Sequence, residues 1–110
     1  MATSSFISYL AKDVPNTNVS LITASAGAQT SIIGLSCTNT SLANNITANV
    51  YITRSGVDFY LVRYAPVPTG GSLVVVGGDQ KVVLNEGDIL RVSSSANTSM
   101  DAIASALVIT

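Results

Sequence analysis

The stretch "ITANVYITR", Ile46 to Arg54, alternates small or aliphatic side chains with polar or aromatic ones along its length. In an extended strand, successive side chains point to opposite faces. The even-numbered residues from Ile46 to Ile52 would therefore share one apolar face, and Thr47, Asn49 and Tyr51 the other. Isoleucine, valine, threonine and tyrosine are also the residues that strands favour. The stretch predicts a half-buried β-strand with one face in a core.

The same pattern recurs on both sides of this stretch, with turn-forming Gly, Asn, Asp, Ser and Pro residues about every ten positions. It predicts an all-β fold, a compact antiparallel β-sandwich of jelly-roll or Ig-like type with about eight or nine short strands. A chain of 110 residues fits one domain, so we expect a single domain over 1–110. The expected strands are 5–12, 19–24, 31–38, 46–53, 58–64, 72–76, 81–84, 89–94 and 101–109.

The two ends of the chain are less clear. In "SMDAIASALVIT", 99–110, the alanines tolerate a helix, but the closing "LVIT" favours a strand, which we expect. Near the N-terminus, Phe6, Ser8 and Leu10 alternate as an ordinary strand does. The same residues also suit a docking arm over 1–12 that adds a strand to the sheet edge of a neighbour. Both interpretations remain open at this point.

Charged residues make up 10% of the chain, against about 25% in typical soluble domains. Fifteen serines, eleven threonines and eight asparagines replace them. Neutral polar groups cost much less to desolvate than ions, and the centres of protein interfaces are depleted in charge. We therefore expect a protein that works inside an assembly. Because assemblies of identical chains usually have closed symmetry, a homo-oligomer is expected, with a trimer as the first guess.

Two classes of partner are disfavoured. The net charge is −1, and the five lysines and arginines are scattered singly, whereas binding to phosphates requires clustered positive charge. We therefore expect no nucleic-acid partner. No apolar run approaches the roughly 18 residues of a membrane span, so no membrane partner is expected.

The chain is also poor in the residues that catalysis uses. It has no histidine, and its single cysteine, Cys37, cannot form an intrachain disulfide or a zinc site alone. The "TGGS" and "GGDQ" stretches read as turns between strands and not as phosphate-binding loops. We expect no catalytic, cofactor-binding or metal-binding residues, no cofactor and no enzyme activity. Cys37 is in step with Ile33 and Leu35, so we expect it to be buried in the core.

One short stretch, "NEGD" at 85–88, invites a second interpretation because it places two carboxylates beside a glycine. A calcium site needs six or more converging oxygen atoms, and only Asp79 lies near in sequence. We therefore predict the tip of a β-hairpin, with Gly87 at a positive φ and with Glu86 and Asp88 as turn residues.

The stretch "DFYLVRYAPVP", 58–68, holds three of the six aromatic residues. Alternation places Phe59, Leu61 and Arg63 on one face and Tyr60, Val62 and Tyr64 on the other. Tyrosines are enriched at protein interfaces and also stack on sugars, so a carbohydrate-binding module is an alternative function of another class. The candidate interface residues are Phe6, Tyr9, Tyr60, Arg63 and Tyr64.

The order of motifs over about 30–110 resembles small β-rich structural proteins of tailed bacteriophage particles. The resemblance rests on "SIIGLSCTNTS", "ITANVYITRSGVDFYLVRYAPVPTGGSL", "KVVLNEGDILRVSSSAN" and the closing strand. It implies a virion structural protein, first a capsid decoration or cement protein that stabilises the head shell, and second a neck or tail component. The implied partners are the major capsid protein or neck and tail proteins, and the implied location is the virion, after synthesis in the host cytoplasm.

Overall fold

The computed structural model describes residues 4–77 and 81–110, and these contain nine strands and no helix. Each expected strand is confirmed to within three residues at its ends, including the last segment, which is a strand throughout. The predicted "GGDQ" turn lies largely outside the described residues, as does Asp79. The strands are β1 Ser4–Ala11, β2 Val19–Thr23, β3 Gln29–Asn39, β4 Ile46–Arg54, β5 Val57–Val67, β6 Ser72–Val76, β7 Val82–Leu84, β8 Ile89–Ser94 and β9 Met100–Ile109.

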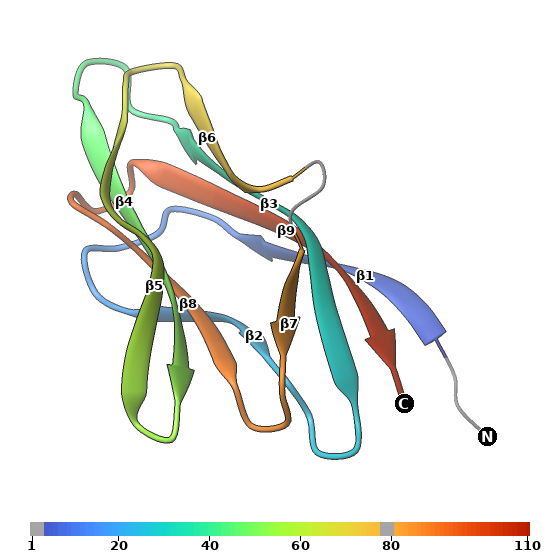
Figure 1. The fold of residues 1–110 in the computed structure, drawn as a ribbon. Helices are drawn as coiled ribbons and strands as arrows, with labels where there is room; N and C mark the ends of the chain where they lie inside the picture. The colour runs from blue at the N-terminus through green and yellow to red at the C-terminus, as the bar shows by residue number, and fades with distance from the viewer. Residues whose placement is uncertain (1–3, 78–80) are drawn as a thin grey trace.

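The strands form two antiparallel sheets that pack face to face (Figure 1). In the A sheet the order is β1-β9-β3-β6, with β7 also paired to β3, and in the B sheet it is β2-β8-β4-β5. Four ladders are nested in sequence: β4 pairs β5, β3 pairs β6 and β7, β2 pairs β8, and β1 pairs β9. The chain is thus one long hairpin ribbon folded over itself, which is the jelly-roll arrangement and not the Ig-like one.

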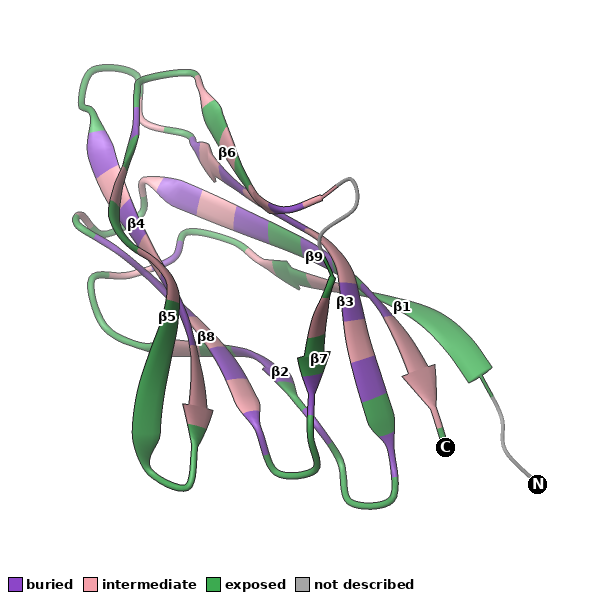
Figure 2. Ribbon diagram, viewed as in Figure 1, coloured by how far each residue is buried: buried purple, intermediate pink, exposed green. Residues whose placement is uncertain are grey.

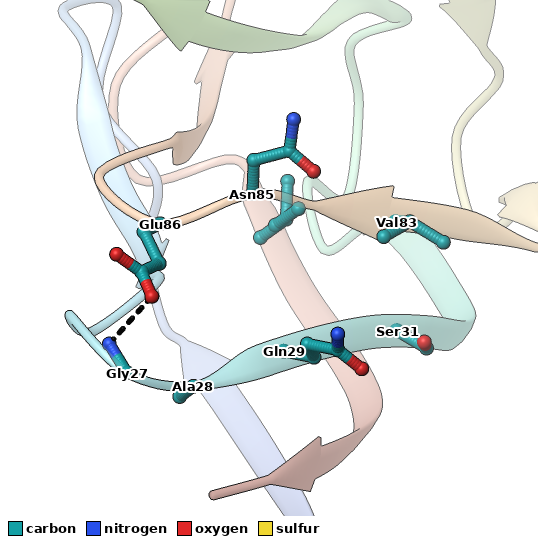
Figure 3. Close-up of a pocket in the computed structure, with 8 residues that line it drawn as sticks. Gly27, Ala28, Gln29, Ser31, Val83, Asn85 and Glu86 are labelled. Carbon is teal, nitrogen blue, oxygen red and sulfur yellow. Dashed lines mark hydrogen bonds between the residues drawn. The ribbon is translucent and has the colours of Figure 1, made fainter.

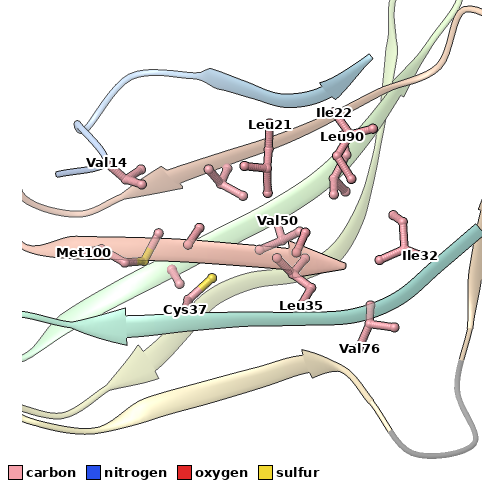
Figure 4. Close-up of a cluster of buried hydrophobic side chains, with 14 of the residues drawn as sticks. Val14, Leu21, Ile22, Ile32, Leu35, Cys37, Val50, Val76, Leu90 and Met100 are labelled. Carbon is pink, nitrogen blue, oxygen red and sulfur yellow. The ribbon is translucent and has the colours of Figure 1, made fainter. Parts of the chain in front are cut away.

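The core lies between the two sheets and follows from the period-two pattern of the strands (Figure 4). Val50 on β4 and Leu90 on β8 are fully buried from the B sheet. Opposite them, β9 contributes Ala102, Ala104 and Ala106, all fully buried. Small side chains here leave room for the larger aliphatic groups of the facing sheet, as close packing requires. The alanines that left this segment ambiguous in the sequence are therefore packing residues of a strand.

Bulges change some of the predicted faces. In β3 the register with β9 shifts between Ile32 and Gly34. As a result Ile32 and Leu35 both point into the core, while Ile33 is only partly buried. The prediction that Ile33 shares the core face with Cys37 is therefore wrong, because an extra residue in a strand reverses the alternation beyond it. Cys37 itself is fully buried, as expected.

At one end of the sandwich, the side chain of Asn39 bridges the β3–β4 loop and strand β5. Its side chain is 2% exposed, and its amide nitrogen donates to the carbonyl oxygens of Asn44 and Val67 at 2.9 and 3.0 Å. Its side-chain oxygen accepts from the backbone N–H of Ser41 at 2.8 Å. The β3–β4 loop is thereby fastened to the end of β5.

The molecule measures 50 × 27 × 22 Å, with a radius of gyration of 13.8 Å. This agrees with the value of about 13 Å for a globular chain of this length. In the part of the chain that the structure describes, no helix has the length and apolar character of a membrane span.

Candidate interaction surfaces

The "NEGD" turn connects the two sheets and is not the tip of a hairpin. Strand β7 pairs β3 in the A sheet, whereas β8 pairs β2 and β4 in the B sheet. The turn runs beside the β2–β3 connection, where Gly87 N donates to Ala24 O at 3.0 Å and Ala24 N donates to Asp88 O at 2.9 Å. The hairpin prediction is therefore wrong, because the ribbon bends from one sheet to the other at this point. The positive φ predicted for Gly87 is confirmed, at +83°.

The two carboxylates of this corner have separate partners. Asp88 is 1% exposed, and its oxygens accept from Arg54 Nε at 2.9 Å, Arg54 Nη2 at 2.6 Å and the backbone N–H of Asn85 at 2.8 Å. The hydrogen bonds from Arg54 hold the pKa of Asp88 below its ordinary value, although burial opposes them. Glu86 remains exposed and accepts from Gly27 N at 2.8 Å. Asp88 is thus a buried anchor and not an exposed turn residue.

These partners leave little for a cation to bind. The bidentate contact with Arg54 occupies the carboxylate of Asp88, and one oxygen of Glu86 is bound to a backbone amide. Within residues 4–77 and 81–110, no group of three or more His, Cys, Asp or Glu side chains comes together.

An open groove of about 640 Å³ lies beside the corner, between the start of β3 and β7 (Figure 3). Figure 3 shows Glu86 directed at the Gly27 amide across one end of the groove. The other lining groups are aliphatic, amide, hydroxyl and backbone groups, without a second carboxylate for acid–base chemistry. The lining residues are Gly27, Ala28, Gln29, Ser31, Val83, Leu84, Asn85 and Glu86.

The corner gives a first prediction. Gly87→Val should lower the free energy of unfolding by about 1–3 kcal/mol, because a β-branched residue is strained at positive φ. Glu86→Ala, the neighbouring control, should change it by only about 0.5 kcal/mol, since it removes one exposed hydrogen bond. Urea unfolding of the two variants measures both values. A Glu86→Ala variant as unstable as Gly87→Val would show that the side chain of Glu86, and not the φ of Gly87, holds the corner.

The tyrosine and arginine residues of 58–68 gather on the outer face of the B sheet. The rings of Tyr51 and Tyr60 lie 4.9 Å apart between centroids. The Arg63 guanidinium lies over the Tyr60 ring at 5.0 Å and over the Tyr64 ring at 5.1 Å. We call Tyr60, Arg63 and Tyr64 the tyrosine patch.

The predicted faces of this strand are wrong for Arg63, which lies with the tyrosines and not with Phe59. Strand β4 pairs β5 with two irregularities, on either side of Val50, and Tyr64 has a φ of +54°. These bulges rotate Arg63 onto the tyrosine side. As a result, the guanidinium stacks on the rings of both Tyr60 and Tyr64 from the same side of the sheet.

Below the patch, Tyr51 is 2% exposed, and its hydroxyl is hydrogen-bonded to the side chain of Asn18. Burial raises its pKa, and the neighbouring Arg91 opposes the rise. Arg91 Nε is buried without a hydrogen-bond partner among the described residues. Sequence alternation placed Tyr51 on the outer face, but its burial there depends on neighbours that only the fold brings together.

Phe6 and Tyr9 lie elsewhere, on β1 at the edge of the A sheet. Phe6 is 78% exposed and Leu10 72% exposed, on the outer face, whereas Tyr9 on the inner face packs partly against the core. Across the ladder, Leu10 lies opposite Ile103, which is also exposed. The five candidate residues therefore form two separate groups, three on β5 and two on β1. Sequence reasoning missed Leu10 and Ile103, although the Phe6, Ser8 and Leu10 alternation already indicated a shared face.

The thiol of Cys37 is buried, and its burial makes it unreactive. Burial raises the pKa of the Cys37 thiol to about 11, so the reactive thiolate is scarce at neutral pH.

Comparison with known proteins gives a match in fold alone. No family model matches the chain, and no curated protein matches it in sequence. A chain in the crystal structure of the IBDV viral particle is 11% identical, with a TM-score of 0.59, over 98% of this chain. The nucleoplasmin-like N-terminal domain of Drosophila FKBP39 is 14% identical, with a TM-score of 0.47, over 93% of this chain and 87% of its own. This chain spans 30% of the IBDV chain, so its jelly roll is similar to one portion of a chain in a viral particle.

Proposed function

We propose that this protein is a structural subunit of a viral particle, and that within this class it is a capsid decoration protein on the head of a tailed bacteriophage. The observation that carries the proposal is the likeness of this jelly-roll fold, over 98% of the chain and with a TM-score of 0.59, to part of a chain of the IBDV particle. Fold alone does not dictate function, so the surface must support it as well. The resemblance of 30–110 to small phage proteins supports the tailed-phage assignment.

Two features of the surface support a role in assembly. The tyrosine patch combines the residue types that dominate binding energy at interfaces, tyrosine and arginine. The outer face of β1 exposes the large apolar side chains of Phe6 and Leu10. Exposed apolar patches of this kind mark sites of interaction with other molecules. The proposal assigns no reaction and no cofactor to the chain.

Cryo-electron microscopy of purified particles that carry this 11.3 kDa chain tests the proposal. We expect jelly-roll density at repeated, symmetry-related positions on the outside of the head. Density confined to the neck or tail would replace the decoration role by the second role that the resemblance implies. Absence of the chain from purified particles, measured by mass spectrometry, would contradict both.

A second prediction concerns the tyrosine patch as the contact with the shell. The double variant Tyr60→Ala, Arg63→Ala should bind purified heads lacking the protein at least about tenfold more weakly, since central Tyr and Arg contacts cost about 2 kcal/mol or more when truncated. Phe59→Ala is the matched control, because Phe59 lies on the same strand but pairs with Ile52, so its side chain is on the opposite face of the sheet from the patch. Co-sedimentation with heads measures the binding. Equal loss in both variants, or loss in neither, would place the contact elsewhere.

A further inference from the structure

Strand β1 is an edge strand without the features that normally keep sheet edges from pairing. It forms eight consecutive pairs with β9 without a register shift, and it contains no proline and no charged residue. Figure 2 shows it exposed along most of its length. A long, regular edge strand with exposed apolar side chains presents unpaired N–H and C=O groups and pairs readily with another strand.

The other edge strands of the described residues are protected. Strand β5 is bulged and carries Arg63 and Pro66. Strand β2 has five residues and an irregularity after Ser20. Strand β6 has five residues, and β7 has three. Among the edge strands of the described residues, β1 alone therefore lacks features that protect it from pairing.

From this edge we propose that two copies of the chain pair through their β1 strands, antiparallel about a twofold axis, to form one continuous sheet across the dimer. Opposed residues in an antiparallel ladder must both direct their N–H and C=O groups into the seam or both away from it. The seam, which is the row of hydrogen bonds between the two β1 strands, can therefore be symmetric only if its centre is a residue. A centre at Ser8 places apolar side chains of one copy opposite apolar side chains of the other. It places Ser8 opposite Ser8 of the second copy, Phe6 opposite Leu10, and Ile7 opposite Tyr9.

The second copy fits this edge in shape and charge. The required partner is an extended, neutral strand with apolar side chains at alternate positions, and β1 is such a strand. The charged residues that follow it, Lys12 and Asp13, fall at opposite ends of the seam in the two copies, so like charges do not meet. The exposed Phe6 and Leu10 side chains of the copies come together on one face. The pairing yields a twofold contact, in place of the trimer expected from composition.

Cysteine cross-linking tests the register. Residues directly opposed in an antiparallel ladder have Cα atoms about 4.5–5.5 Å apart, within the range of a disulfide. Ser8→Cys should therefore give a covalent dimer under mild oxidation. Ser5→Cys on the same strand is the matched control, because its two copies lie about 20 Å apart in this register. The native Cys37 is buried, so the unmodified chain should give no covalent dimer.

A charge exchange tests the same seam without cysteine. Phe6→Lys with Leu10→Lys sets like charges across it and should raise the dimer dissociation constant about 100-fold or more. Phe6→Lys with Leu10→Glu sets opposite charges across it and should restore much of the affinity. Both side chains are largely exposed, so both variants should keep the circular dichroism of the fold.

Analytical ultracentrifugation of the full chain should show a dimer that the first pair of substitutions dissociates. A clean monomer up to several hundred micromolar, or a Ser8→Cys variant that cross-links no better than Ser5→Cys, would overturn the proposal. Cross-linking in purified particles of Ser8→Cys to another protein would assign the edge to that protein and also overturn it. The proposed dimer rests on the proposed assembly role and adds detail to it. It does not depend on where in the viral particle the protein lies. A dimer in solution from a chain absent from particles refutes only the proposed function.

Discussion

Asp88→Ala should lower the free energy of unfolding by about 3 kcal/mol and the melting temperature by on the order of 10 °C. The substitution removes a buried carboxylate that binds Arg54 through two nitrogen atoms and the Asn85 amide through one bond. The Asn85 N–H loses its acceptor, and the β7–β8 corner loses its tie to the end of β4. Thermal and urea unfolding measure the loss. Glu86→Gln, an exposed carboxylate changed in the same turn, is the control and should melt like the unmodified chain.

The same carboxylate predicts a pH dependence with a definite sign. Because the pKa of Asp88 is lowered in the folded chain, its contribution is fully present above the ordinary carboxyl pKa of about 4. It is lost progressively as the pH falls from there toward the folded pKa. The gap in stability between the unmodified chain and Asp88→Asn should stay constant from neutral pH to about pH 5 and narrow below pH 4. A gap that persists undiminished at pH 3 would contradict an ionised Asp88 as its source.

Asn39→Ala is the other substitution with a large expected effect, again about 3 kcal/mol. It removes three hydrogen bonds at a position that is almost completely buried, and it leaves two carbonyl oxygens and one amide without their partner. Buried polar groups without partners are costly, so the β3–β4 loop should detach from the end of β5. Amide hydrogen exchange should rise in residues 40–45 before the sheets open.

Asn45→Ala provides the comparison at the same end of the molecule. The side chain of Asn45 accepts from the N–H and the hydroxyl of Thr69, but the contact is exposed to water, which can replace it. We expect a loss of less than about 1 kcal/mol. Equal losses at Asn39 and Asn45 would show that burial does not set the cost.

The local pattern of the sequence was sufficient to predict the strands. Alternation such as that of "ITANVYITR" depends only on which side chains reach water. Together with the Gly, Asn and Asp turns between the strands, it predicted every strand and the sandwich class. The positive φ of Gly87 was equally local, since a turn needs a residue without a Cβ there. The burial of Cys37 on β3 followed from its alternation with Leu35, two positions earlier.

Three features depended on contacts between distant residues. The ladder of β7 with β3, and of β8 with β2 and β4, made "NEGD" a corner between sheets. That corner brought Asp88 to Arg54, 34 positions away, and so turned an expected turn residue into a buried anchor. Bulges near Ile33 and Val50 reversed the faces beyond them, since one extra residue inverts a period of two.

The candidate interaction surfaces were also predicted in part from the sequence and in part only from the fold. Composition indicated Tyr60, Arg63 and Tyr64 as interface residues, but the stacking of Arg63 on both rings required the bulged pairing of β5 with β4. For Phe6, the sequence left a core strand and a docking arm open. Pairing with β9 made the segment an ordered edge strand, and the outer face of that strand left Phe6 and Leu10 exposed. The sequence by itself determined which residues alternate, because burial of alternate side chains is a local pattern. Only the tertiary structure decided which strand lies at an edge, because that depends on pairing between residues nearly a whole chain apart.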